Sequence, residues 1–367
     1  MKKIIAIIIV ITFFINIPLA FAVNNESNDI SKFPVRFSWR NIDGIDYTTS
    51  VKNQLPAPTC EAYALVAALE TIVQYKVGYP FDCDLSEAHL FFYPGGTTDW
   101  GINVTYSTDY LIEHGVPDEG CFPDPHRPYD FLFESLPGWE NRTIKITDWG
   151  WVENDVDSIK SALIEYGPLT ICMLTRNNFF SYSGGIYMPF GLVQGGHVIT
   201  ITGYDDIHRC WEIKNSGGDA WGEDGYIRVS YDADSPEHPF FWPFYGGTGI
   251  LYVDGVYGNF IPDVPKIEMV KPALRRTYLF GHEMKIIFKK LPIQASAPRI
   301  IGNLIVKTVT SNTNMVDFYV DDVLVFSDDE EPFEFVLDTT RGLHIIEAYA
   351  YNDFNVSKDI VDVFVFI

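Results

Sequence analysis

Residues 51–65, VKNQLPAPTCEAYAL, lead from an irregular stretch into a helical pattern whose first turn holds Cys60. Over residues 59–78 the apolar side chains recur at helical spacing, at Ala62, Leu65, Val66, Leu69 and Val73. Gly78 follows the last of them, in the position where glycine commonly ends a helix. We therefore expect a buried helix over residues 59–78, with a cysteine at its start.

The position of Cys60 suits a nucleophile. A thiol attacks a carbonyl group only as the thiolate, and a helix N-terminus together with a histidine is a common way to favour that form. The alternative is an inert buried cysteine, since free cysteines are often buried. The chain has five cysteines, and in an exported protein an odd count leaves one thiol outside any pairing. The sequence does not show how Cys83, Cys121, Cys172 and Cys210 would pair.

Two later segments supply partners for Cys60. They are GGHVITITGYDD, which contains His197, and WEIKNSGGDAWGEDGYIRV, which contains Asn215. Residues 51–65 resemble the nucleophile segment of the papain family of cysteine peptidases, and the two later segments resemble its histidine and asparagine segments. The three occur in the same order as in the family. The resemblance extends from about Phe37 to Val229 and includes DLSEAHL and PGG near residues 84–96.

This resemblance implies a role for each matching residue. His197 would accept the proton of the Cys60 thiol and later donate it to the leaving amine, and Asn215 would orient the imidazole ring. Gln54 would donate its side-chain amide to the oxyanion, together with the backbone N–H of Cys60. Taken singly, His197 is also compatible with a structural histidine, Gln54 with a surface side chain and Asn215 with a turn residue.

Three further residues match positions that bind substrate in the family. Gly95 and Gly96 match a glycine pair whose backbone pairs with an extended substrate, and Trp221 matches a tryptophan beside the leaving-group side of the cleft. The alternatives are an ordinary turn at PGG and a core tryptophan.

Several positions around the nucleophile depart from the family. Ala57 replaces a cysteine, Pro58 and Thr59 replace glycine and serine, and Glu61 and Gly217 each replace a tryptophan. A carboxylate beside the thiol opposes thiolate formation. We hypothesise that the side chain of Glu61 turns inward and fills the space left at Gly217.

The segment pattern changes along the chain and predicts an α+β fold. Helical patterns at STDYLIEHG and DVDSIKSALIEYG are followed, from Leu169 onward, by short strand-like segments rich in β-branched and aromatic residues. The resemblance implies a papain-like two-lobed domain, one lobe helical and one β-barrel-like, over residues 23–262. Alternating strands over residues 263–367 favour an all-β immunoglobulin-like sandwich, after the linker IPDVP.

Residues 1–22, MKKIIAIIIVITFFINIPLAFA, have the charged start, apolar run and small-residue end of a signal peptide. We expect cleavage after Ala22 and a secreted, extracellular protein without stable membrane insertion. An uncleaved membrane anchor is the alternative, since the apolar run is almost long enough to span a bilayer.

The net charge and the motif content exclude some classes of partner. A formal net charge of −23 opposes binding to nucleic acid. No metal-ligand cluster, phosphate loop or dinucleotide motif is found in the sequence, so no cofactor is implied. The expected function is hydrolysis of polypeptide substrates. The alternatives are an inactive peptide-binding protein and an adhesion protein that contacts a cell surface or glycan through its C-terminal domain.

Overall fold

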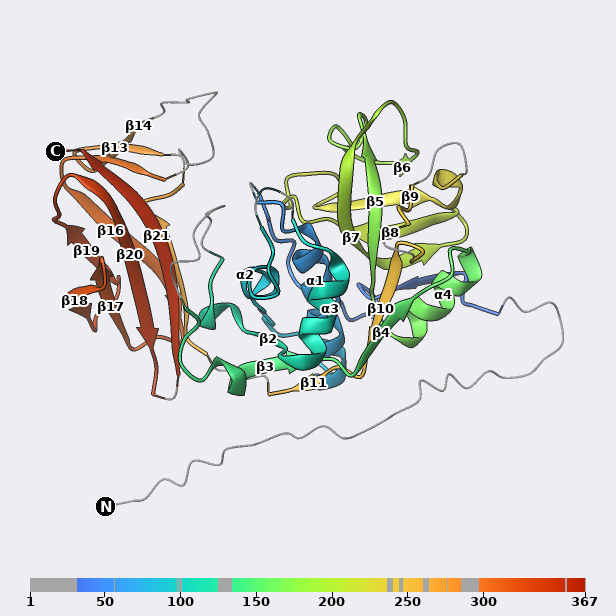
Figure 1. Ribbon diagram of the computed structural model, residues 1–367, viewed down its shortest axis with the longest axis horizontal. Helices are drawn as coiled ribbons and strands as arrows, with labels where there is room; N and C mark the ends of the chain where they lie inside the picture. The colour runs from blue at the N-terminus through green and yellow to red at the C-terminus, as the bar shows by residue number, and fades with distance from the viewer. Residues whose placement is uncertain are drawn as a thin grey trace, which may run out of the picture.

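The computed structural model describes most of the chain after residue 31. The described residues are 32–55, 57–97, 99, 101–124, 134–235, 240–243, 247–259, 264–274, 276–284, 297–353 and 355–366. Residues 1–31 lie outside this set, and with them the predicted signal peptide. Figure 1 shows three neighbouring parts: a helical lobe, a lobe built on a large sheet, and a C-terminal β region.

The first lobe is built around helix α1 (Cys60–Val77). Helices α2 (Glu87–Phe92) and α3 (Val104–Glu113) pack against it. Gly78 ends α1 in the left-handed conformation, at φ 88°, and its N–H donates to the carbonyls of Gln74 and Tyr75, as the sequence pattern predicted. The lobe also contains β2 (Val116–Pro117), η1 (Glu119–Cys121), η2 (Trp139–Arg142), β3 (Thr143–Lys145) and β11 (Tyr257–Gly258).

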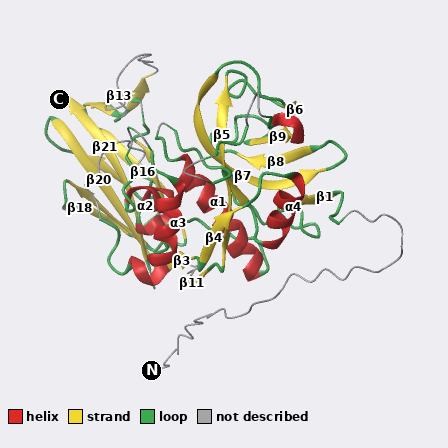
Figure 2. Cartoon of the chain, turned by 45° about the vertical axis from the view of Figure 1, so that its right-hand side comes forward, coloured by secondary structure: helices red, strands yellow, loops and turns green. Residues whose placement is uncertain are grey.

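Helix α1 is buried on nearly all sides rather than on one face. Figures 1 and 2 show it between α2 and α3 on one side and strands β5 and β7 on the other. The five apolar residues predicted to face the core are buried, and so are the carboxyl groups of Glu61 and Glu70, each 1% exposed. Helix α1 therefore lies at the boundary between the two lobes and contacts both of them.

The second lobe contains an eight-stranded sheet in the order β4-β10-β5-β7-β8-β9-β6, with β1 paired to β7. Helix α4 (Val156–Glu165) packs against it and follows one of the predicted helical patterns. The strands are β1 (Arg36–Ser38), β4 (Asp148–Trp151), β5 (Leu169–Arg176), β6 (Ile186–Tyr187), β7 (Val193–Asp205), β8 (Cys210–Lys214), β9 (Tyr226–Ser230) and β10 (Ile250–Asp254), and η3 (Tyr231–Ala233) follows β9. These strands confirm the change from helix to strand predicted near Leu169.

The C-terminal region consists of two sheets that share one apolar core. One has the order β12-β16-β19 and the other β14-β13-β15-β21-β20-β17-β18. Their strands are β12 (Lys266–Lys271), β13 (Thr277–Leu279), β14 (His282–Met284), β15 (Arg299–Ile301), β16 (Leu304–Ser311), β17 (Met315–Val320), β18 (Val323–Asp328), β19 (Glu334–Leu337), β20 (Gly342–Tyr351) and β21 (Val356–Phe366). The larger sheet is mixed, because β15 pairs in parallel with β13 and β21. The β character is confirmed, whereas the immunoglobulin-like assignment and the boundaries at residues 262 and 263 stay predictions.

The C-terminal region is attached to the first lobe through buried polar contacts. Arg142 forms a bidentate ion pair with Asp118, at 2.5 and 2.8 Å, and donates to the carbonyl of Val356 in β21 at 2.9 Å. Gly120 leaves no room for a side chain, because a Cβ there would lie 2.1 Å from the Ser357 hydroxyl. The first lobe and β21 therefore meet over a closely fitted contact.

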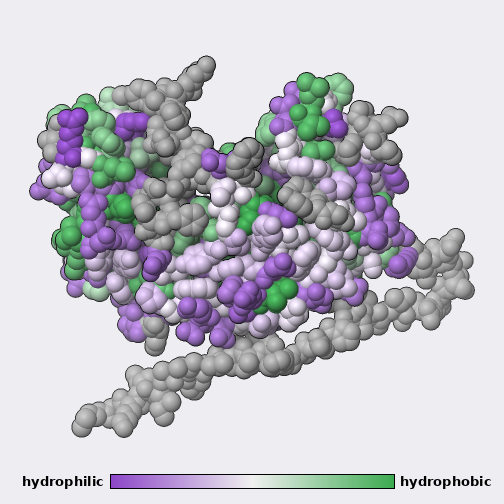
Figure 3. Space-filling view, in the orientation of Figure 1, coloured by the Kyte–Doolittle hydropathy of each residue, from purple (hydrophilic) through white to green (hydrophobic). Residues whose placement is uncertain are grey.

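On the face shown in Figure 3, hydrophilic side chains are spread over all three parts, and the formal net charge of the chain is −23. Hydrophobic surface gathers at the top of the second lobe, where the loops between β5 and β7 expose Phe180, Met188, Phe190 and Leu192. Within the described residues, no helix is both long and apolar enough to cross a bilayer.

Candidate active site

Cys60 is the first residue of α1 and is half-buried. The helix N-terminus favours a thiolate at this position. Burial acts more strongly in the other direction and, with the neighbouring Glu61 carboxyl, raises the pKa of the thiol to about 12. Hydrogen bonds from the backbone N–H groups of Val198 and Cys60 itself partly offset this rise. The bond from Val198 places the Cys60 sulfur beside the residue that follows His197.

His197 and Asn215 are brought together by the pairing of β7 with β8, in which Thr200 lies opposite Lys214. The ring Nε2 of His197 lies 2.8 Å from the side-chain oxygen of Asn215. Because that oxygen can only accept, Nε2 carries the proton and Nδ1 is left as the basic nitrogen. Burial lowers the pKa of His197, and the bond to Asn215 partly offsets that effect. Burial therefore favours a neutral imidazole beside a neutral thiol.

An aromatic group packs against the His197 ring. Phe179, in the loop after β5, lies edge-on to it with the ring centroids 5.8 Å apart. Trp221 is half-buried and packs on Phe179, at 4.9 Å, and on Tyr182, at 5.6 Å. Trp221 thus reaches His197 through Phe179. The sequence analysis did not predict that Phe179 packs on His197. The adjacent aromatic residues Phe179 and Phe180 were the signal in the sequence.

Gln54 is held by two residues of the site. The Ser216 hydroxyl donates to its side-chain oxygen at 2.5 Å, and its side-chain nitrogen donates to the Ala57 carbonyl at 3.0 Å. A second N–H on that nitrogen is left for a ligand. Ser216 follows Asn215 directly, so one loop positions both the histidine partner and the amide predicted to bind the oxyanion.

Glu61 points inward, as hypothesised. Its residue is 1% exposed, and its Oε1 accepts no hydrogen bond. Burial raises the pKa of its carboxyl well above the ordinary value, against the N–H groups of Glu61 and Ala62 that favour ionisation. The second part of the hypothesis stays a prediction: apart from the chain neighbours of Gly217, the atoms within 4 Å of a Cβ built there belong to Asn215. Glu61 acts on Cys172 of β5, whose pKa rises by burial and by the Glu61 charge.

Gly95 and Gly96 follow α2. The N–H of Gly96 donates to the Phe91 carbonyl at 2.9 Å, and a Cβ on Gly96 would lie 2.4 Å from that oxygen. Their pairing with substrate stays a prediction. Gly101, which the sequence reasoning passed over, is the glycine beside the nucleophile loop: a Cβ built there would be 3.2 Å from the Pro58 carbonyl.

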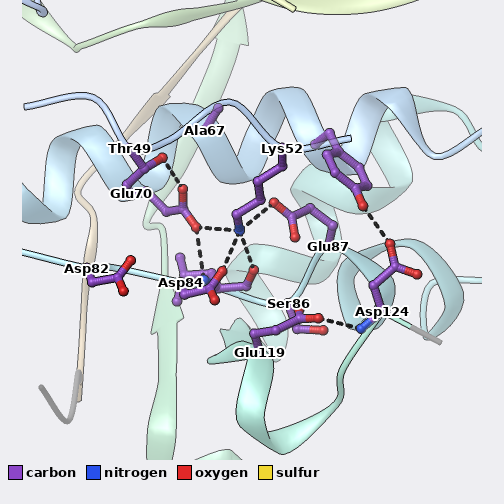
Figure 4. A network of polar contacts seen from close by, with 12 residues as sticks. Thr49, Lys52, Ala67, Glu70, Asp82, Asp84, Ser86, Glu87, Glu119 and Asp124 are labelled. Atoms are coloured by element: carbon purple, nitrogen blue, oxygen red, sulfur yellow. Dashed lines mark hydrogen bonds and ion pairs between the residues drawn. The ribbon is translucent and has the colours of Figure 1, made fainter. Parts of the chain in front are cut away.

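A partly buried ionic cluster lies behind the site, with Glu70 and Glu87 buried and Lys52 and Asp84 half-buried (Figure 4). The Lys52 ammonium contacts the carboxylates of Asp84, Glu87 and Glu70 at 2.7, 2.8 and 2.9 Å. Burial alone would lower the pKa of Lys52, yet these carboxylates raise it well above the ordinary value. Burial raises the pKa of Glu87 to about 8.

A small cavity joins this cluster to the site. Its lining residues include Lys52, Glu70, Lys214 and Asn215. Lys214 donates to the Thr49 carbonyl at 2.8 Å, and burial lowers its pKa to about 8. The sequence did not predict the cluster, since Lys52, Glu70 and the segment with Asp84 and Glu87 lie apart in the chain.

All five cysteines are free, including the four whose pairing the sequence left open. In the part of the chain that the structure describes, no group of three or more histidine, cysteine, aspartate or glutamate side chains could hold a metal ion. The site is thus described by its protein groups alone.

Comparison with known proteins places this geometry in a family. Residues 33–237, more than half of the chain, match the sequence profile described as Papain family cysteine protease. Fruit bromelain of Ananas comosus is 27% identical over 226 residues, which cover 60% of this chain and 62% of that protein. The match therefore spans less than two thirds of fruit bromelain.

Two further similarities agree. Mexicain of Jacaratia mexicana is 30% identical over 200 residues, which cover 54% of this chain and 88% of mexicain. The structure of a recombinant stem bromelain precursor superposes with a TM-score of 0.50 at 28% identity and covers 63% of this chain and 74% of that one. The chain belongs to the papain family of cysteine peptidases.

Proposed function

We propose that this protein is a secreted peptidase that hydrolyses peptide bonds of polypeptide substrates with Cys60 as nucleophile, His197 as base and Asn215 as the residue that orients the base. One observation carries the proposal: the His197 Nε2–Asn215 bond of 2.8 Å lies next to a helix-start cysteine whose sulfur receives the Val198 N–H. Family membership supports the reaction class.

The first half of the reaction forms a thioester. Nδ1 of His197 takes the Cys60 proton, and the sulfur attacks the substrate carbonyl carbon. The resulting oxyanion accepts hydrogen bonds from the free N–H of Gln54 and the backbone N–H of Cys60. The imidazolium then gives its proton to the nitrogen of the breaking C–N bond, and the amine leaves.

The second half returns the enzyme. His197 removes a proton from water, and the hydroxide oxygen attacks the thioester carbonyl. The C–S bond breaks, the acid product leaves, and the sulfur regains the proton from the imidazolium.

The test compares the purified protein with C60A, using a thiol-directed epoxide and denatured casein. We expect labelling and casein cleavage in the wild type and neither in C60A. Cleavage that survives in C60A would remove Cys60 from its role. Labelling without cleavage of any polypeptide would favour the alternative, a papain-like peptide-binding protein.

We also propose export through residues 1–22 with cleavage after Ala22. The apolar run and small-residue end support it. Expression of the full chain in a secreting host should place a form that begins at Val23 in the medium, as read by N-terminal sequencing. A cell-bound form that begins at Met1 would favour the anchored alternative. Contact of the C-terminal region with a cell surface or glycan stays a prediction.

A further inference from the structure

A buried acid follows the proposed nucleophile directly in the chain, and one of its two carboxyl oxygens has no hydrogen-bond partner. Glu61 is 1% exposed, and its Oε1 accepts no hydrogen bond from the protein. It contrasts with the other buried carboxyl group of the same helix, Glu70, which is met by an ammonium, a hydroxyl and a backbone N–H. A buried carboxyl group that lacks a cation is held in its neutral form unless the pH is high.

The groups around Glu61 offer its anion little help. The titratable groups in electrostatic contact with it are the thiols of Cys60, on its own helix, and Cys172, on β5. Its only favourable contacts are the backbone N–H groups of Glu61 and Ala62 at the start of α1. Among the described residues no cation pairs with it.

The same proximity couples Glu61 to the reaction. The attacking sulfur is an anion, and a carboxylate one residue away opposes it. After burial, the Glu61 carboxyl group has the largest effect on the pKa of Cys60, and it raises that pKa. The carboxylate of Glu61 and the thiolate of Cys60 therefore disfavour each other.

We propose that Glu61 is a positioning residue whose neutral form permits the Cys60 thiolate and whose ionisation suppresses it, so that Glu61 sets the alkaline limit of the reaction. The proposal rests on the proposed function of Cys60. No atom of Glu61 needs to touch the substrate. Its effect on the rate comes through the charge that it places, or does not place, beside the sulfur.

The experiment follows the rate of Cys60 alkylation by iodoacetamide from pH 4 to pH 10, with the labelled site identified by mass spectrometry. It compares wild type with E61Q, which keeps the shape but cannot ionise, and with C172S, which removes the neighbouring thiol. We expect wild type and E61Q to react within about twofold of each other at pH 5, because Glu61 is protonated there. At the alkaline end E61Q should react about tenfold faster.

Two results would overturn the proposal. Identical pH profiles would make Glu61 a structural residue only. A constant ratio at every pH would mean that Glu61 is ionised throughout. If E61Q fails to fold, E61L serves in its place, since leucine also lacks the charge and fits an apolar pocket.

Peptide hydrolysis is measured over the same pH range. We expect the alkaline fall of kcat/KM to move to higher pH in E61Q, by about one unit. Alkylation does not require turnover, so the two proposals fail separately. Diverging alkylation profiles without hydrolysis would reject the peptidase and keep the role of Glu61, whereas hydrolysis with matching profiles would do the reverse.

Discussion

Helix α1 buries two carboxyl groups about 13 Å apart along its axis, and they are treated in opposite ways. Glu70, in the middle of the helix, accepts from Lys52 at 2.9 Å, from the Leu85 N–H at 2.9 Å and from the Thr49 hydroxyl at 2.5 Å. Glu61, in the first turn, has an oxygen with no donor at all.

The difference shows two ways to bury an acid. One is to supply a cation and enough donors, so that the charged form is stable. The other is to leave the group without a cation, so that it stays protonated. The first arrangement ties together segments of the lobe behind the site, and the second leaves an ionisable group beside the nucleophile. The two regions should therefore respond differently to substitution and to pH.

The largest expected effect comes from removing the cation. In Lys52→Met the carboxylates of Glu70, Asp84 and Glu87 would lose their shared ammonium, which contacts them at 2.7 to 2.9 Å. Breaking a buried ion pair from one side costs about 3–5 kcal/mol. Urea unfolding at neutral pH measures this loss.

A surface pair provides the matched control. Lys307 contacts Glu334 at 2.6 Å in the C-terminal region, with side chains 46% and 31% exposed. Solvent screens such a pair, so Lys307→Met should cost less than about 1 kcal/mol. Equal losses in the two variants would contradict the importance of the buried cluster.

The second expected effect separates the two carboxyl groups directly. At pH 5 Glu70→Gln should cost about 2–3 kcal/mol of unfolding free energy, because a charged hydrogen bond to Lys52 is lost. Glu61→Gln should change it by less than about 1 kcal/mol, because a neutral amide replaces a neutral acid. The comparison needs only chemical denaturation of both variants. Similar costs at the two positions would mean that Glu61 is ionised in the folded protein.

The sequence predicts the fold of the first two lobes well for a physical reason. Apolar periodicity and a terminal glycine define α1. The pairing of β7 with β8 brings His197 and Asn215 together, and the Val198 N–H of β7 meets Cys60 at the start of α1. Short stretches of sequence determine such helix and strand patterns, so they can be predicted without knowing the rest of the fold.

Contacts between distant segments are harder to predict. Lys52, Glu70 and the segment that holds both Asp84 and Glu87 lie apart in the sequence, and the spacing along the chain does not indicate that they meet. The signal in the sequence was Glu70, an acidic residue between the predicted core positions Leu69 and Val73. The hypothesis that Glu61 turns inward is confirmed by its burial. It did not predict the neighbour Cys172, which lies more than a hundred positions away and is placed there by β5.

The smallest expected effect is a change in how the free energy of unfolding depends on pH. The folded state raises the pKa of Glu61 above its ordinary value of 4.5, so above that pH the unfolded chain releases a proton that the folded protein keeps. Stability then falls as the pH rises, by up to about 1.4 kcal/mol per unit. Glu61→Gln lacks this loss. The raised pKa of Glu87 also makes stability depend on pH, but it does so equally in wild type and variant and drops out of their difference. Unfolding in urea should show that the stability of the variant relative to wild type increases by about 1 kcal/mol between pH 4.5 and pH 5.5. A difference that stays constant between those pH values would show that Glu61 finds a partner for its charge.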